Sequence, residues 1–289
     1  MFVADNSLKS VKYYFSDRLK PIFSEREIRL MFQLCVEKRL KLTPSEVLLS
    51  DQVRMSESDL LFFRSVVKRL LNGEPFQYIH GETEFYGLLL KTDARALIPR
   101  PETEELVDWI VKSQSSGMKT IVDVCSGSGC ITLALKQQFP AADVTGIDVS
   151  REALSLSIEN ATLNQLNVHF EQKDVLLSEP NTEANSIDVI VSNPPYVKEN
   201  EKIGMQGHVL EHEPHLALFV DDDSPLIFYD KITAFAFHAL KPGGWLYFEI
   251  NEQYGPEMVE LLKTYAFNQV ELKKDLQGKD RMIRGQKTV

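Results

Sequence analysis

The chain has 289 residues, of which 43% are hydrophobic and 26% are charged, and its formal net charge is −10. This composition fits a globular protein of one large or two ordinary domains, and no apolar run reaches the roughly 20 residues that span a bilayer. Up to Glu74 there are 13 Lys and Arg against 10 Asp and Glu. The remainder is therefore acidic, which argues weakly against a substrate held through nucleic-acid phosphates.

The first residues lack the basic start and the apolar stretch of a signal peptide, so we expect none. The three cysteines, Cys35, Cys125 and Cys130, are too few and too scattered for a disulfide framework. We therefore expect a cytoplasmic protein whose thiols serve in packing, with no membrane association.

Residues 1–74 show hydrophobic residues at helical spacing and three starts that resemble capping boxes, at Ser24–Glu27, Thr43–Glu46 and Ser56–Asp59. They predict a small N-terminal helical bundle, which binds partners or packs as a cap and does no chemistry. Residues 75–98 follow a Gly-Glu-Pro break and contain short β-like pieces from Gln77 onward, so they predict a β-hairpin linker.

The segment Ile98–Glu105 allows two interpretations. A proline at position 101 followed by three carboxylates is typical of the first turn of a helix, where the helix dipole favours negative charge. Alternatively, the loop covers a ligand. The residues themselves leave both interpretations open.

From Thr120 onward strands and helices alternate, which predicts an α/β fold with a doubly wound, Rossmann-like sheet of seven strands in a domain spanning residues 99–289. The strands are expected at 120–124, 143–147, 168–172, 187–192, 245–250, 270–274 and 281–283, the last two as an antiparallel pair. The intervening helices are expected at 130–139, 150–163, 228–240 and 256–265.

A glycine turn, Cys125-Ser126-Gly127-Ser128-Gly129, joins the first of these strands to a helix, and Asp148 ends the second strand about 20 residues later. This arrangement is typical of nucleotide binding, with the carboxylate on the ribose hydroxyls. A dinucleotide fits poorly, because Thr132 stands where the third glycine of the Gly-x-Gly-x-x-Gly pattern would fall. S-adenosyl-L-methionine has no phosphate, so its binding requires fewer glycines in the turn. Asp174, at the end of the third strand, is placed to reach the adenine amine. The alternative is that both aspartates are loop caps.

The tetrapeptide Asn193-Pro194-Pro195-Tyr196 follows a buried apolar strand, Ile187–Val191. Two prolines cannot donate to a strand ladder, so the strand must end at Asn193, at the carboxyl edge where α/β proteins bind ligands. An amide and a carbonyl held rigidly side by side can position a planar NH2 group as a nucleophile.

The glycine turn, Asp148 and the tetrapeptide together resemble the class I methyltransferases that modify planar nitrogens. Within them the chain is similar to the release-factor glutamine methyltransferases, the HemK/PrmC family, over nearly its whole length. The stretches that carry this narrower resemblance are Gly73–Ile79, Phe85–Gly87, Leu97–Glu104, Glu213-Pro214 with Ala217-Leu218, and Lys279–Arg281. Two positions depart from the family: Cys125 stands where a glycine usually opens the turn, and Val175 where an aromatic often follows the acidic residue.

The resemblance implies that S-adenosyl-L-methionine is the cofactor, held by residues 125–129 with Asp148, Asp174, Val175 and Asn193. It implies that class I peptide chain release factors are the substrates, methylated on the glutamine of a Gly-Gly-Gln motif. Asn193 and the Pro194 carbonyl would accept the two amide N–H groups, beside Pro195, and Tyr196 would pack on the flat amide. We expect a monomer, no stable nucleic-acid binding and an N-terminal bundle that recognises the substrate protein.

His208, His212 and His215 suggest a metal by their spacing, but Pro214 interrupts any regular helical face, and we expect no metal. Residues Val197–Asp223 are expected to form a mobile flap over the substrate.

Two other functions stay open. One is an N6-adenine or guanine-N2 methyltransferase acting on nucleic acid, which would share the tetrapeptide but should show a basic groove. The other is a cofactor-binding adaptor without catalysis, which only Cys125 supports.

Overall fold

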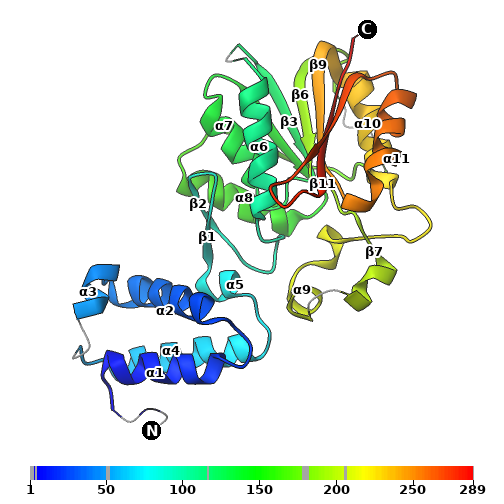
Figure 1. The fold of residues 1–289 in the computed structure, drawn as a ribbon. Coiled ribbons are helices and arrows are strands. Elements are labelled where there is room, and N and C mark those ends of the chain that lie inside the picture. Colours follow the sequence, from blue (N-terminus) through cyan, green and yellow to red (C-terminus); the bar gives the residue numbers. More distant parts are fainter. Residues whose placement is uncertain are drawn as a thin grey trace. The chain divides into compact units, whose positions relative to one another are not determined.

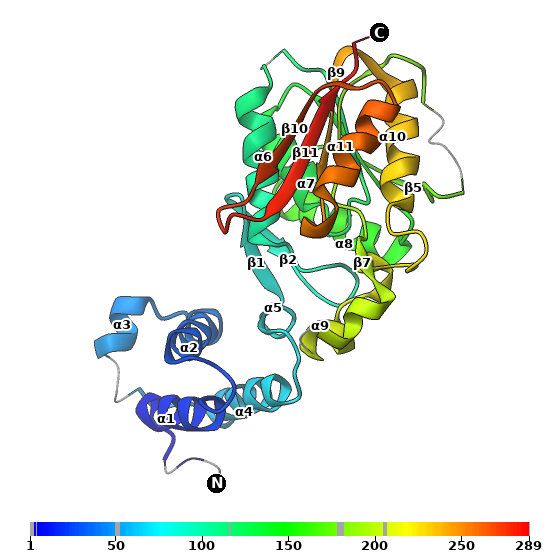
Figure 2. The same cartoon turned by 45° about the vertical axis from the view of Figure 1, so that its right-hand side comes forward.

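The computed structural model describes Val3 and residues 5–49, 53–115, 117–177, 182–204 and 207–288. The chain falls into two compact units, seen from two directions in Figures 1 and 2. One unit comprises Met1–Gly81 with Gln206–His212, and the other comprises Glu82–Met205 with Glu213–Val289.

Among its described residues the smaller unit contains helices joined by loops, and a single antiparallel β-bridge between Ser7 and Arg54. Its helices are α1 (Leu8–Leu19), α2 (Glu25–Leu40), α3 (Pro44–Leu49), α4 (Glu57–Leu71), α5 (Phe76–His80) and α9 (Gly207–His212). The predicted capping boxes at Ser24 and Ser56 are both present, each with the reciprocal pair of hydrogen bonds. Phe15, Phe32 and Phe63 contact one another in its core. No described helix is long and apolar enough to cross a membrane.

The prediction of β structure from Gln77 was wrong at its start, because Phe76–His80 forms the short helix α5. Gly81, which suggested a β turn, has φ +78° and ends this helix in the left-handed conformation. The hairpin itself consists of β1 (Glu82–Phe85) and β2 (Leu88–Lys91), which pair antiparallel across a two-residue turn. Both turn residues, Tyr86 and Gly87, have positive φ, as tight hairpin turns require.

The larger unit is built on a seven-stranded sheet, which confirms the predicted α/β doubly wound fold. The strand order is β10-β11-β9-β6-β3-β4-β5, and β11 runs in the direction opposite to the other six strands of that sheet. The strands are β3 (Thr120–Val124), β4 (Asp143–Asp148), β5 (His169–Gln172), β6 (Ile187–Ser192), β9 (Leu240–Glu249), β10 (Asn268–Lys274) and β11 (Asp280–Gln286).

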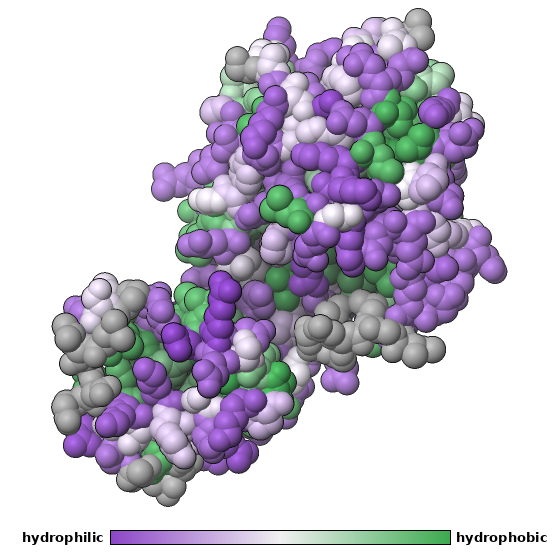
Figure 3. Space-filling view, viewed as in Figure 1, coloured by the Kyte–Doolittle hydropathy of each residue, from purple (hydrophilic) through white to green (hydrophobic). Residues whose placement is uncertain are grey.

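Helices cover both faces of this sheet (Figure 1). They are α6 (Pro101–Ser113), α7 (Cys130–Gln138), α8 (Arg151–Leu163), α10 (Ile227–Ala239) and α11 (Gly255–Thr264). Side chains of α6 and α7 form one hydrophobic core with the sheet, and side chains of α10 and α11 form the other. On the side shown in Figure 3, hydrophilic residues cover most of the larger unit, and hydrophobic ones form separate patches.

The segment predicted to be a flap contains β7 (Val197–Lys198), which pairs in parallel with β8 (Phe219–Val220). Between these strands lie the short helices η1 (Glu199–Gly204), α9 and η2 (His215–Ala217), and a third short helix, η3 (Glu252–Tyr254), follows β9. Residues 205 and 206 lie outside the described part of the chain. The mobility of this segment stays a prediction.

Candidate functional site

A pocket opens at the carboxyl ends of β3, β4 and β6. This is the edge of an open α/β sheet at which ligands bind. The whole predicted glycine turn except Gly129 lines it, together with Asp148, Asp174, Val175 and Asn193. Pro101 begins helix α6, so the helix interpretation of Ile98–Glu105 is confirmed. Residues 95–100 also line the pocket, and the interpretation that this loop covers a ligand stays a prediction.

The glycine turn has positive φ at three of its five residues, Cys125 (+61°), Gly127 (+54°) and Gly129 (+80°). A cysteine in this region carries strain that a glycine avoids. At Gly129 a Cβ would lie 3.1 Å from the Cβ of Ser157 and 3.2 Å from the ring of Phe170, so a larger residue there would force these neighbours to move. The turn therefore favours glycine at Gly129, its last residue, and has a strained backbone at Cys125, its first residue.

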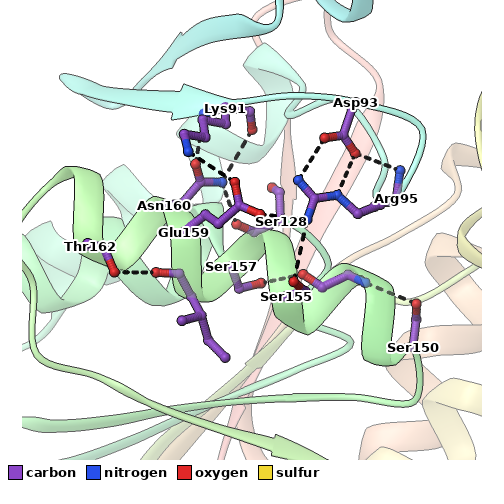
Figure 4. A network of polar contacts seen from close by, with 12 residues as sticks. Lys91, Asp93, Arg95, Ser128, Ser150, Ser155, Ser157, Glu159, Asn160 and Thr162 are labelled. Atoms are coloured by element: carbon purple, nitrogen blue, oxygen red, sulfur yellow. Dashed lines mark hydrogen bonds and ion pairs between the residues drawn. The ribbon is translucent and has the colours of Figure 1, made fainter.

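Helix α8 holds the turn through two buried side chains (Figure 4). Ser157 Oγ donates to the carbonyl of Gly127 at 2.7 Å, and Asn160 Nδ2 donates to the carbonyl of Ser128 at 3.0 Å. Asn160 Oδ1 also accepts the N–H of Lys91 at 2.7 Å, which joins the end of the hairpin to the same network. These hydrogen bonds fix the backbone of the turn against α8.

Asp148 ends β4 inside the pocket. One of its carboxylate oxygens accepts the N–H of Gly127 at 2.8 Å and the other accepts the N–H of Ser150 at 2.9 Å. Burial raises the pKa of this carboxyl, and the backbone hydrogen bonds oppose the rise. These backbone contacts fix the direction of the carboxylate inside the pocket.

Asp174 and Val175 also line the pocket. Asp174 Oδ1 accepts the N–H of Leu176 at 2.9 Å, so the loop-cap interpretation describes part of its contacts. The Val175 side chain is buried and packs against the core formed with α10 and α11.

The tetrapeptide follows β6, whose last residue is Ser192, so the predicted end of the strand is confirmed. Asn193 and Pro195 line the pocket, whereas Pro194 and Tyr196 are outside its described lining. Asn193 Nδ2 donates to Thr103 Oγ1 at 3.3 Å, and the hydroxyl of Tyr196 donates to Glu249 Oε1 at 3.2 Å. The tetrapeptide is thus held by polar side chains from α6 and β9.

Sequence reasoning missed three buried carboxylates beside the pocket. Glu249 ends β9, Glu213 precedes η2, and Asp123 lies in the middle of β3, and all three side chains are buried. A single acidic residue inside an apolar run, as in Leu246–Ile250, was the signal available for Glu249 and Asp123. Glu213 was singled out only as part of the family resemblance, because it does not stand inside an apolar run.

Asp123 has one satisfied oxygen and one unsatisfied oxygen. Its Oδ2 accepts both the N–H and the hydroxyl of Thr132, at 3.0 and 2.6 Å. Its Oδ1 is buried with no hydrogen-bond partner among the described residues. Burial raises the pKa of this carboxyl to about 7. Thr132, which replaces the third glycine of a dinucleotide pattern, therefore serves as the hydrogen-bond donor to Asp123.

The pocket fits the cofactor that the sequence suggests. Ser126 Oγ is buried, lines the pocket and has no hydrogen-bond partner within the described chain, so a polar ligand group is needed to satisfy it. The Asp148 carboxylate lies in the same pocket, held by backbone N–H groups. S-adenosylmethionine consists of an adenosine joined to an amino acid. Its ribose hydroxyls can donate to Asp148, and its other polar atoms can bond to Ser126.

No metal centre is evident in the described part of the chain, where no group of three or more His, Cys, Asp or Glu side chains could hold an ion. The side chain of His208 lies outside the described residues.

Comparisons with known proteins agree with this geometry. The model of the methyltransferase small domain matches residues 103–215, and the model of the PrmC N-terminal domain matches residues 14–81. A methyltransferase of Pyrococcus furiosus has a similar fold, with a TM-score of 0.50 and 17% identity, over 70% of this chain and 90% of that one. The fold and the pocket define a class I methyltransferase, a class whose cofactor is S-adenosylmethionine.

Two curated relatives narrow the class. A release factor glutamine methyltransferase of Flavobacterium psychrophilum is 44% identical over 96% of this chain and 98% of its own length. A second one, from Bacteroides thetaiotaomicron, is 37% identical over 96% of this chain and 99% of its own length. The chain belongs to the release factor glutamine methyltransferase family.

Proposed function

We propose that this protein transfers the methyl group of S-adenosyl-L-methionine to the N5 amide nitrogen of the glutamine in the Gly-Gly-Gln motif of class I peptide chain release factors. The observation that carries the proposal is the identity of 44% over nearly the full length of both chains with a relative named for this activity. The position of Asn193 at the rim of the pocket supports it.

The chemical problem is that the lone pair of an amide nitrogen is delocalised into its carbonyl, so the nitrogen is a poor nucleophile. Asn193 Oδ1 accepts one N–H of the glutamine amide and the Pro194 carbonyl accepts the other. Pro195 stiffens this corner and Tyr196 packs on the flat amide. Positioning of this kind supplies up to roughly 7–11 kcal/mol in well-oriented systems. No strong base is needed, because the alkylated amide is acidic and loses its proton afterwards.

The cofactor supplies a methyl group bonded to a positively charged sulfur, and the pocket orients it toward that nitrogen. In this proposal the turn of residues 125–129 contacts its methionine part, and Asp148 accepts the two ribose hydroxyls. Asp174 accepts the adenine amine, and Val175 forms part of the apolar wall beside the adenine. Asn193 lies between cofactor and substrate.

The division of the chain into residues 1–74, 75–98 and 99–289 is part of the proposal, with the first segment recognising the release factor and the last doing the chemistry. We also propose that the protein acts as a monomer in the cytoplasm and forms no stable complex with nucleic acid. The three free thiols, Cys35, Cys125 and Cys130, suit such a reducing compartment.

The decisive experiment supplies the purified chain with radiolabelled S-adenosylmethionine and one of three substrates. These are a release factor, the same factor with its motif changed to Gly-Gly-Ala, and ribosomal RNA. We expect label in the intact release factor only. Label in RNA alone would favour the nucleic-acid methyltransferase, and cofactor binding without label in any substrate would favour the adaptor.

A further inference from the structure

Thr103 and Glu249 form a buried chain of hydrogen bonds behind Asn193. Thr103 Oγ1 donates to Glu249 Oε2 at 2.6 Å, and Asn193 Nδ2 donates to the same Thr103 oxygen at 3.3 Å. The other Glu249 oxygen accepts the hydroxyl of Tyr196 at 3.2 Å. Thr103 and Glu249 are each only 2% exposed, so water does not compete for these contacts.

Which atom donates in each of these hydrogen bonds follows from the number of protons that each side chain carries. An amide side chain has nearly the same shape after its oxygen and nitrogen exchange places, so only its hydrogen bonds decide which atom faces the pocket. A threonine hydroxyl has a single proton, and Thr103 gives it to Glu249. Thr103 Oγ1 can then only accept from Asn193, which must present Nδ2 to it. Asn193 Oδ1 is consequently turned away from Thr103.

We propose that Thr103 and Glu249 are positioning residues that fix the Asn193 amide with its oxygen toward the substrate. This inference rests on the proposed function, in which that oxygen accepts an N–H of the glutamine. If the amide flipped, Nδ2 would face the substrate NH2 group, and two donors would oppose each other. Glu249 also holds Tyr196, so a single carboxylate orients two members of the tetrapeptide.

The charge of Glu249 is essential to this arrangement, because an ionised carboxylate accepts hydrogen bonds from both Thr103 and Tyr196 and can donate none. Burial raises the pKa of Glu249, and Glu102 on α6 adds to the rise. Arg281 on β11 and the hydrogen bonds from Thr103 and Tyr196 oppose it.

The hydroxyl of Tyr229 on α10 faces the backbone carbonyl of Glu249, to which it donates at 3.1 Å, and not the carboxylate. When Glu249 becomes protonated it can donate to Thr103. The threonine proton is then free to point at Asn193, and the amide loses its fixed direction.

The first test compares two variants of Thr103 with the wild type in the methyl-transfer assay. Thr103→Val keeps the shape but removes the hydroxyl, and we expect kcat to fall about 100-fold, the loss typical of a misplaced catalytic group. Thr103→Ser restores the hydroxyl and should recover kcat to within about threefold. Affinity for S-adenosylhomocysteine and the melting temperature should stay close to wild type in the serine variant. Equal kcat values for the valine and serine variants would overturn the inference.

The pH profile provides a readout that a merely structural role would not move. In the wild type, kcat should fall as the pH drops through the pKa of Glu249, and Glu249→Gln should have a lower kcat without that fall. An identical acid limb in both proteins contradicts the inference. Failure of the wild type to methylate the release factor at any pH contradicts the proposed function instead, so the two failures are distinguishable.

Discussion

Arg100 donates a hydrogen bond of 2.6 Å to Glu213, a residue 113 positions away whose side chain is only 1% exposed. The other Glu213 oxygen accepts the N–H of Ile98 at 3.3 Å. Arg100 and Ile98 line the pocket, as does Pro214, the residue after Glu213. A buried carboxylate therefore joins the loop before α6 to the segment before η2, and both form the wall of the pocket.

Removing Arg100 alone should lower the free energy of unfolding more than removing the charges of both Arg100 and Glu213. Arg100→Met leaves Glu213 buried and uncompensated, which we expect to lower the free energy of unfolding by roughly 3 kcal/mol. In the double variant Arg100→Met with Glu213→Gln, the neutral amide still accepts the N–H of Ile98 and most of the loss should be recovered. Urea denaturation of the three proteins measures this, and a double variant less stable than the single one would contradict it.

Asn193→Ala should reduce kcat for release-factor methylation by at least 100-fold, because the amide nitrogen loses the group that orients it. The dissociation constant of S-adenosylhomocysteine should change by no more than a few-fold. Asn200→Ala, at an exposed asparagine seven residues later, serves as the matched control and should behave as wild type. Near-normal turnover of the Asn193 variant would remove the proposed mechanism.

Asp148→Asn should weaken binding of S-adenosylhomocysteine by roughly 10- to 100-fold, the loss expected for hydrogen bonds to a charged group. Because burial raises the pKa of this carboxyl, wild-type affinity should decrease as the pH falls through that raised pKa, since the neutral acid is the poorer acceptor. The variant should lose this dependence. Calorimetric titration across pH, with Asp143→Asn at the exposed start of β4 as control, measures both effects.

Cys125 offers a prediction about backbone strain, because its φ of +61° is one that side chains disfavour. Cys125→Gly removes a strain of roughly 1–2 kcal/mol but makes the unfolded chain more flexible, so stability should change by less than about 1 kcal/mol. Cys125→Val places a branched side chain in the same conformation and should cost roughly 1–3 kcal/mol. Thermal melts rank the stability of the two variants. A valine variant as stable as the glycine variant would contradict the prediction.

Asp123 should make the protein less stable as the pH rises. Its pKa is raised by burial to about 7, so the folded state holds a proton there that the unfolded state has lost. The stabilisation is complete below the ordinary carboxyl pKa near 4 and disappears as the pH rises through about 7. Denaturation of wild type and Asp123→Asn from pH 4 to 8 should show this slope in the wild type only. Parallel pH profiles would contradict the assignment.

Much of the fold could be read from the sequence, because it is encoded locally. The apolar run Ile187–Val191 and the prolines after it fixed both the existence and the end of β6. The capping boxes at Ser24 and Ser56 fixed two helix starts in the same way. The prediction from local sequence was wrong at Phe76–His80, which is helical. Gly81 ends this helix, and a glycine at a helix end cannot be told from one in a hairpin turn by its sequence alone.

The predicted site residues were found by the same logic, since the carboxyl ends of parallel strands share one edge of the sheet. Residues 125–128, Asp148, Asp174 and Asn193 meet in one pocket for this reason. What holds them could not be predicted, because Thr103 and Glu249 are 146 residues apart and nothing local relates them.

The sequence by itself determined the order of strands and helices, the residues at the strand ends and the family. Periodicity, turn chemistry and strand polarity carry the information on the elements, and all three act over a few residues. The family followed from the resemblance of short sequence stretches. Only the tertiary structure decided which carboxylates are buried, where their protons go and therefore which way the Asn193 amide points. Those features depend on burial and on hydrogen bonds between distant segments, which exist only once the chain has folded.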